Sequence, residues 1–237
     1  MSPDPAPAPG AGRPAPGDLL ALGGLVLALP AAHWALLTAG GFHLHFDEAQ
    51  YWTWSRELDW SYATKGPLVA WGIALGNTLF GPGESALRAL AWATHGLFLV
   101  LVFLFALDLW GSRRAAWSAL ALALTTPLYF LLGGVMTTDV FLFACWTGAL
   151  WAAWRALVRG RRRAWYAMGL AVGVGALAKL SIGLLPLFTG LAMALHRPWR
   201  RLFLAREPWL AAAIVALCMA PMRSEERRVG KECTLRC

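Results

Sequence analysis

The stretch "ALRALAWATHGLFLVLVFLFALDLW", Ala86 to Trp110, is apolar along almost its whole length and carries charge only at Arg88 and Asp108. A run of about 20 apolar residues is long enough to cross the ~30 Å hydrocarbon core of a bilayer as a helix. Similar runs, or longer ones that divide into two, lie on both sides of it: Leu19 to Leu37, Ala115 to Leu132, Val140 to Leu157, Trp165 to Leu195 and Trp209 to Met222. They predict an all-α, polytopic transmembrane bundle with about five to seven crossings.

Composition and charge agree with a membrane protein. The 237 residues are 58% hydrophobic and 14% charged, whereas soluble domains are about 25% charged. The net charge of +8 could suggest nucleic acid as a partner, but the bases sit in short clusters at the ends of apolar runs, which is the positive-inside pattern. No nucleic-acid partner is therefore expected. The clusters are Arg113 and Arg114; Arg159 with Arg161, Arg162 and Arg163; and Arg197, Arg200, Arg201 and Arg206.

The two ends of the sequence differ from the apolar module at 19–222. Residues 1–18, "MSPDPAPAPGAGRPAPGD", are rich in Pro, Ala and Gly, so we expect a disordered cytoplasmic tail before a retained first span rather than a cleaved signal peptide. Residues 223–237 begin "RSEERRVGKEC" and resemble a translated short-read sequencing adapter. We expect that segment to be an artefact, with the natural chain continuing beyond Met222.

Charge parity predicts which segments face outward. If the arginine clusters are cytoplasmic, the loop "GGVMTTD" at 133–139, the turn "AKLSIG" at 178–183 and the whole segment from Gly40 to about Glu84 lie on the outer side. Ionisable groups at membrane depth are costly and are functional candidates by default. The outer segments bring together five such groups: Asp47, Glu48, Lys65, Asp139 and Lys179.

The outer segment "FDEAQYWTWSRELDWSYATKGPLVAW", Phe46 to Trp71, allows several interpretations. Its tryptophans suit an interfacial helix with rings at headgroup level. In that case Asp47 could be a helix N-cap and Glu48 a partner of the helix dipole. Lys65 could be a snorkelling anchor or a point charge for phosphate.

Two further pairings remain open from the residues alone. His43 and His45, with Asp47 and Glu48, have a spacing that could ligate a divalent cation, although no third fixed ligand is evident. Glu84 and Arg88 stand four residues apart at a helix start, a spacing that also favours a simple ion pair.

Three motifs together resemble a known family. "FDEAQYWTWS" with "LDWSYATKGPLVAW", then "TTDVFLF", then "GLAVGVGALAKLSIGLLPL" are similar to bacterial glycosyltransferases of family 39, in the GT-C superfamily. These are relatives of the protein O-mannosyltransferases and of the aminoarabinose transferase that modifies lipid A. The resemblance covers about Leu19 to Met222 and corresponds to the N-terminal part of such an enzyme.

The resemblance implies a reaction and roles for the outer residues. The donor would be a polyprenyl-phosphate-linked sugar, and the acceptor hydroxyl would belong to lipid A or core, another glycan or a protein. Asp47 would be the catalytic base and Glu48 its support, Lys65 and Lys179 would bind the donor phosphate, and Asp139 would orient the sugar or the first loop. No cofactor is firmly implied, although a divalent cation is possible. The enzyme would reside in the bacterial inner membrane with its site facing the periplasm.

The sequence departs from the family at one element. Relatives often carry Lys-Pro-Pro or Glu-Lys-Pro where this chain has Thr64-Lys65-Gly66-Pro67, which leaves sugar contacts there undecided. The alternative functions are a transporter, which predicts ionisable groups near the midplane and paired broken helices, and a noncatalytic membrane fragment.

Overall fold

The computed structural model describes residues 12–62 and 65–236, and for 223–236 it describes the backbone only. The chain is helical: α1 (Pro16–Ala39), α2 (Phe46–Arg56), α3 (Leu68–Phe80), α4 (Glu84–Trp110), α5 (Arg113–Thr125), α6 (Pro127–Gly134), α7 (Thr138–Leu157), α8 (Arg162–Ala176), the short 3₁₀ turn η1 (Leu180–Gly183), α9 (Leu184–Leu195), the 3₁₀ segment η2 (Arg197–Leu204) and α10 (Arg206–Arg236).

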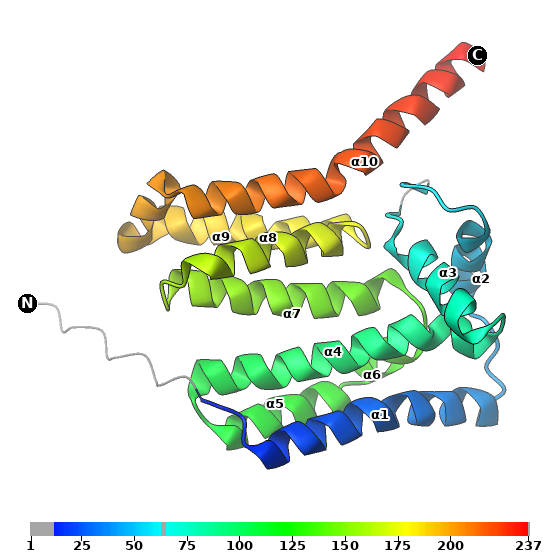
Figure 1. The fold of residues 1–237 in the computed structure, drawn as a ribbon, viewed down its shortest axis with the longest axis horizontal. Helices are drawn as coiled ribbons and strands as arrows, with labels where there is room; N and C mark the ends of the chain where they lie inside the picture. The colour runs from blue at the N-terminus through cyan, green and yellow to red at the C-terminus, as the bar shows by residue number, and fades with distance from the viewer. Residues whose placement is uncertain (1–11, 63–64, 237) are drawn as a thin grey trace, which may run out of the picture.

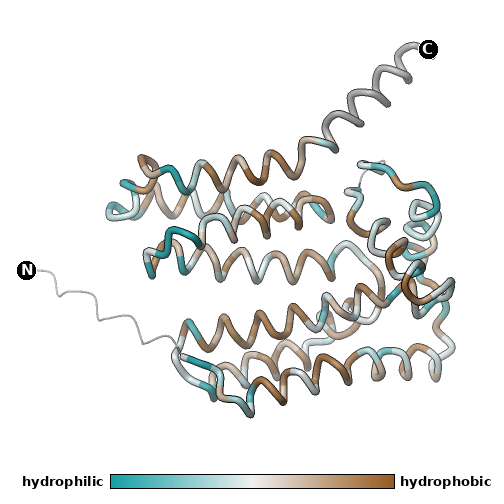
Figure 2. The backbone as a smooth tube through the Cα atoms, in the orientation of Figure 1, coloured by the Kyte–Doolittle hydropathy of each residue, from teal (hydrophilic) through white to brown (hydrophobic). Residues whose placement is uncertain are grey.

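The long helices lie side by side, and α2 and α3 gather at one end of them (Figure 1). Helix α4 is central and contacts α1, α3, α5 and α7, while α8 packs between α7 and α10. Apolar residues follow the lengths of the helices and polar ones collect near their ends (Figure 2). Among the described residues, three helices (α1, α4 and α7) are long and apolar enough to cross a membrane, or up to five spans if each bent helix pair is counted as one. The predicted all-α membrane bundle is confirmed.

The apolar run expected at Ala115 to Leu132 is not one straight helix. It divides into α5 and α6, which are bent by 66° relative to each other. The cause is local: Pro127 opens α6, and Thr126 before it is extended, with φ −73° and ψ 113°. A residue that precedes proline is driven out of the α-helical region by the proline ring. The Thr126–Pro127 dipeptide therefore causes the break.

The long run at Trp165 to Leu195 turns back near its middle, as the charge pattern predicts. Helix α8 ends at Ala176 and the chain resumes as η1 and α9. On its other side α8 approaches α10 closely. A Cβ added to Gly169 would stand 2.7 Å from the carbonyl oxygen of Ala211, and one added to Gly173 would stand 2.7 Å from Cys218 Sγ. Small residues permit such close helix packing in membranes.

The first helix begins earlier than the sequence indicated. The tail was expected to extend through residue 18, but α1 starts at Pro16, and the described side chain of Asp18 caps it by accepting from the Ala15 backbone N–H at 2.8 Å. Asp18 also accepts from Arg113 at 2.8 and 2.6 Å and from the Trp117 indole at 3.0 Å. Residues 1–11 lie outside the described part of the chain.

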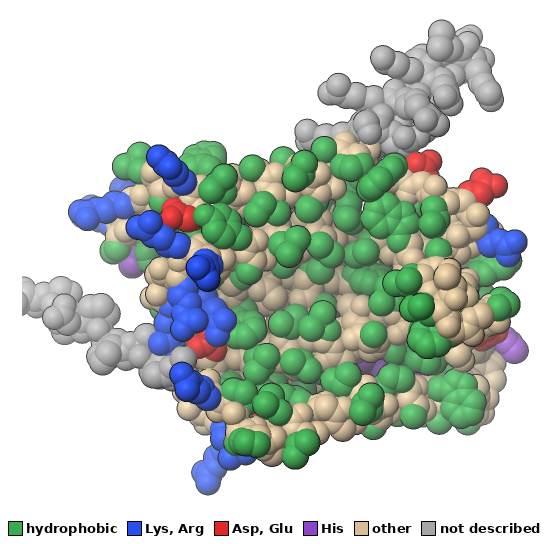
Figure 3. All heavy atoms as spheres, in the orientation of Figure 1, with side chains coloured by type: hydrophobic (Ala, Val, Ile, Leu, Met, Phe, Trp, Pro, Cys, Tyr) green, Lys and Arg blue, Asp and Glu red, His purple; other side chains and the backbone are tan. Residues whose placement is uncertain are grey.

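The two ends of the bundle carry different charges. Blue arginine side chains gather at one end, and red and blue groups are mixed at the other, next to α2 and α3 (Figure 3). The first is called the arginine end and the second the α2 end. The loop at 135–137 and the turn at 177–179 both reach the α2 end, because residues in them bond to Glu48 and Leu68. The outer segments predicted from charge parity therefore share one end of the fold.

Candidate functional site

Glu48 holds the α2 end together. Its carboxylate is fully buried and accepts from Arg88 Nε and Nη2 of α4 at 2.8 and 2.7 Å. The backbone N–H groups of His45 and Met136 donate to the same carboxylate at 3.0 and 2.9 Å. Since an ionised carboxylate offers about four acceptor positions, these four bonds saturate it. The predicted Glu84–Arg88 ion pair is confirmed at 3.3 Å, as one side of this larger network.

Asp47 is in the first turn of α2 but does not cap the helix. The N-cap is His45, whose Nδ1 accepts from the Asp47 backbone N–H at 3.3 Å. The interpretation of Asp47 as N-cap is therefore wrong, and its carboxylate is not used to start α2. Asp47 is half-buried, one residue before the saturated Glu48. Of the adjacent acidic pair, one side chain is structural and the other remains available.

Tyr51 connects Asp47 to the second outer segment. It is only 2% exposed, and its hydroxyl lies near the Thr138 side chain at the start of α7. Burial raises the pKa of the Tyr51 hydroxyl, and the carboxylates of Asp47 and Asp139 raise it further. Both carboxylates therefore lie near one phenol, although they are far apart in the sequence.

The third outer segment joins through an ion pair. Lys179 Nζ donates to Asp139 Oδ1 at 2.7 Å, and the two side chains are 38% and 29% exposed. The expected convergence of Asp139 and Lys179 at one end of the bundle is confirmed by this contact. The lysine is partly open to solvent and is oriented by the carboxylate.

Lys65 lies beside the same turn through its backbone. Lys65 and Tyr62 exchange backbone hydrogen bonds at 2.7 and 3.1 Å, and the Leu68 N–H donates to the Leu177 carbonyl at 3.1 Å. A Cβ on Gly66 would overlap that carbonyl group of Leu177. Gly66 is therefore needed for the loop that carries Lys65 to approach the turn that carries Lys179.

The metal-ligand interpretation finds little support in this geometry. Within the described ranges, no group of three or more His, Cys, Asp and Glu side chains is placed to hold a metal ion. The ring of His45 caps α2, Glu48 is saturated by other donors, and His43 Nδ1 lies 3.5 Å from Glu84. Three of the four candidate ligands thus have other partners, and of the four only the Asp47 side chain has no such partner among the described residues.

Two residues of the site were not singled out from the sequence. Arg88 was considered only as the partner of Glu84, although a charge inside an apolar run needs a buried counter-ion, and that rule could have indicated a second carboxylate. Tyr51 is the second of these residues. Its position one helical turn after Asp47 was the available signal.

Comparison with known proteins shows the family of the chain. Residues 64–224 match the family described as dolichyl-phosphate-mannose-protein mannosyltransferase. The chain belongs to this family. This match confirms the resemblance to glycosyltransferases of family 39 and the expected GT-C class of fold.

The individual relatives of this chain are sugar transferases by name. The chain is 29% identical over 201 residues to the lipid A galacturonosyltransferase RgtD of Rhizobium johnstonii, covering 84% of this chain and 42% of the relative. It is 32% identical over 192 residues to the undecaprenyl phosphate-α-4-amino-4-deoxy-L-arabinose arabinosyl transferase of Pectobacterium carotovorum subsp. carotovorum, covering 74% and 34%.

A solved structure shares the fold. The crystal structure of ArnT from Cupriavidus metallidurans bound to undecaprenyl phosphate superposes with a TM-score of 0.69 and 26% identity, covering 88% of this chain and 41% of that one. The chain therefore spans less than half the length of the relatives it matches.

Proposed function

We propose that this chain carries the acid–base and phosphate-binding part of a membrane glycosyltransferase that moves a sugar from a polyprenyl-phosphate donor to an acceptor hydroxyl. The observation that carries the proposal is the meeting of three separate outer segments at the α2 end, where Lys179 pairs with Asp139 at 2.7 Å and both Asp47 and Asp139 lie near Tyr51. Family membership supports it independently.

Asp47 is the proposed general base. In the transfer, the acceptor oxygen forms a bond to the anomeric carbon while the bond from that carbon to the donor phosphate oxygen breaks. The proton of the acceptor hydroxyl passes to the Asp47 carboxylate. A base must have a free lone pair to take the acceptor proton. Every acceptor position of Glu48 is occupied, which leaves Asp47 as the member of the acidic pair for this role.

Lys179 and Lys65 are the proposed phosphate ligands. Departure of the polyprenyl phosphate leaves negative charge on oxygen, and a preorganised cation stabilises it as it develops. Asp139 holds the Lys179 ammonium in place. We therefore assign Asp139 to positioning that ammonium and the first loop, in addition to any contact with the sugar. Glu48 anchors α2, and it thereby helps to fix the position of Asp47 in the first turn of that helix.

The substrate classes follow from the relatives. Their names specify undecaprenyl phosphate-linked aminoarabinose and lipid A galacturonosyl transfer, so a pentose or uronic acid donor and a lipid A acceptor are the first to test. Glycan and protein acceptors fit the same chemistry. With the arginine end in the cytoplasm, the site faces the periplasm from a bacterial inner membrane. A divalent cation is not needed by the proposed roles.

The test is a transfer assay on the full chain in phospholipid nanodiscs, with undecaprenyl phosphate-4-amino-4-deoxy-L-arabinose as donor and lipid A as acceptor. Mass spectrometry should show lipid A gaining one sugar residue and undecaprenyl phosphate being released in equal amount. Donor that stays intact with lipid A and with glycan and peptide acceptors would overturn the proposal. A transporter would instead move donor across sealed vesicles without cleaving it.

A further inference from the structure

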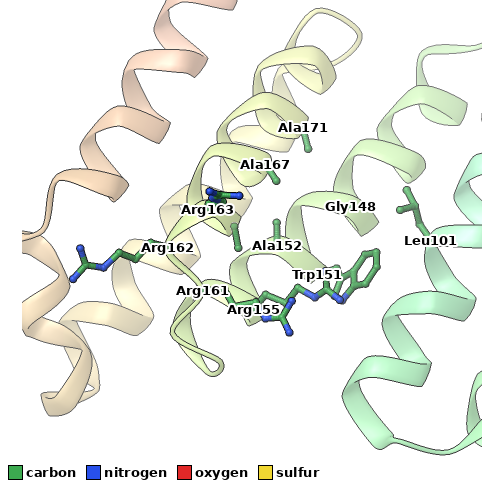
Figure 4. Close-up of a pocket in the computed structure, with 11 residues that line it drawn as sticks. Leu101, Gly148, Trp151, Ala152, Arg155, Arg161, Arg162, Arg163, Ala167 and Ala171 are labelled. Atoms are coloured by element: carbon green, nitrogen blue, oxygen red, sulfur yellow. The ribbon is translucent and has the colours of Figure 1, made fainter. Parts of the chain in front are cut away.

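The arginine end contains a hollow that the transfer reaction does not use. It has a volume of about 690 Å³, within the range of about 300–1,000 Å³ typical of sites for small ligands. It lies between α4, α7 and α8 (Figure 4), and its arginines are at the end of the bundle away from α2 and α3. Its apolar walls are made by Leu101, Gly148, Ala152, Ala164, Ala167 and Ala171.

The walls have the shape and polarity of a groove for a hydrocarbon chain. They combine small side chains on α7 and α8 with Leu101 on α4, and they continue from Arg163 to Ala171 along α8. At about 1.5 Å per residue that distance is ~12 Å, close to the depth of one leaflet of a ~30 Å hydrocarbon core. A free phosphate ion would leave these walls uncovered.

The mouth of the hollow is basic. Arg155, Arg161, Arg162 and Arg163 line it together with Trp151. Arg155 and Arg161 lie beside Trp151, whereas Arg162 points away toward the neighbouring helices (Figure 4).

Carboxylates neutralise only some of these arginines. Arg155 donates to Asp108 at 2.6 Å and its guanidinium stands 4.1 Å from the centre of the Trp151 ring. Arg162 lies 3.4 Å from Glu207 of α10. Within the part of the chain that the structure describes, no ion pair involves the exposed guanidinium groups of Arg161 and Arg163.

We propose that this hollow binds one anionic glycerophospholipid of the leaflet at the arginine end. Its phosphate would be held by Arg161 and Arg163 and one acyl chain would lie along the small residues of α7 and α8. Basic pockets between transmembrane helices are a known means of holding anionic headgroups. A second hollow, of about 810 Å³ between α1, α3 and α4, has Glu84 as the only ionisable residue in its lining, so the charge that selects an anionic lipid belongs to the first hollow.

The probe is phosphatidylglycerol, presented to the full chain in vesicles of equal phosphatidylglycerol and phosphatidylethanolamine and counted by native mass spectrometry. The wild type should retain one phosphatidylglycerol. The double variant Arg161→Gln, Arg163→Gln should retain it roughly 30-fold less tightly, because two charges of about 1 kcal/mol each are lost. Ala167→Leu, which fills the groove and keeps every charge, should weaken retention as well.

Matched controls separate this site from general surface charge. Arg114→Gln removes an exposed arginine of the same end but outside the hollow, and Ala121→Leu enlarges an exposed alanine on α5; both should retain the lipid as the wild type does. The proposal is overturned if Arg114→Gln weakens retention as much as the double variant, if Ala167→Leu has no effect, or if soluble glycerol phosphate binds as tightly as the lipid. It is also overturned if no lipid is retained by the wild type, which would mean that protein covers the hollow.

Discussion

The Arg88 guanidinium of α4 donates two hydrogen bonds to the Glu48 carboxylate of α2, at 2.8 and 2.7 Å, across 40 positions of sequence. Both groups are buried, with 4% and 0% of their side chains exposed. The adjacent Asp47 is half-buried and not part of this pair. Of the acidic pair, Glu48 therefore fixes α2, and Asp47 is left for the role of base proposed above.

Removing either partner of this buried pair should destabilise the protein. Glu48→Gln leaves the Arg88 charge without its main counter-ion, and Arg88→Met leaves the Glu48 carboxylate unpaired. Breaking a buried ion pair from one side costs about 3–5 kcal/mol. Thermal unfolding in detergent, followed by circular dichroism, should show a large fall in Tm for each single variant and a double variant less destabilised than the sum. Glu57→Gln, an exposed acid at the end of α2, is the control, and an equal effect there would contradict the role assigned to Glu48.

Gly66 should not tolerate a side chain. In Gly66→Ala the new Cβ would overlap the backbone carbonyl of Leu177, which cannot rotate away, so the loop before α3 must move. Overpacking of this kind costs about 1–3 kcal/mol. We expect a lower Tm and weaker binding of undecaprenyl phosphate, because Lys65 is displaced. Gly190→Ala inside α9, where nothing lies within 4 Å of the new atom, should lower neither Tm nor binding; if Gly66→Ala lowers neither as well, the close approach is not required.

The Asp139–Lys179 pair should matter more for donor binding than for stability. The pair is partly exposed, and exposed pairs contribute about 0–1 kcal/mol, so Lys179→Gln should change Tm little. Its affinity for undecaprenyl phosphate, measured by titration in nanodiscs, should fall about five- to tenfold because one phosphate-facing charge is lost. Arg56→Gln removes a cation from the end of α2 and should leave affinity unchanged. Equal affinities for Lys179→Gln and wild type would remove Lys179 from the phosphate site.

Much of the fold was predictable because the bilayer imposes a length and a polarity on each span. The runs at Leu19 to Leu37 and Ala86 to Trp110 became α1 and α4 with small shifts at their ends. The turn near Lys179 followed from the positions of the arginine clusters. The break at Thr126–Pro127 was missed because hydropathy alone does not register the restriction that proline places on the residue before it.

The sequence predicted which end of the fold carries the outer ionisable groups, but not which of these groups touch. Charge parity placed Asp47, Asp139 and Lys179 on one side, but no periodicity shows that Asp139 and Lys179 touch or that Arg88 turns toward Glu48. These contacts join segments far apart in the chain, and they depend on how the helices pack. Acidic partners at the arginine end, such as Asp108 with Arg155, depend on packing in the same way.

The central claim is that Asp47 is the general base, and its most direct test is the rate of sugar transfer by Asp47→Asn. The full chain and its variants are assayed in nanodiscs with a saturating polyprenyl-phosphate donor, alongside undecaprenyl phosphate titrations and Tm values. We predict that kcat falls by about 10²–10⁴-fold, while undecaprenyl phosphate affinity and Tm stay close to wild type and Glu57→Gln remains fully active. An Asp47→Asn protein that turns over at the wild-type rate would contradict the account.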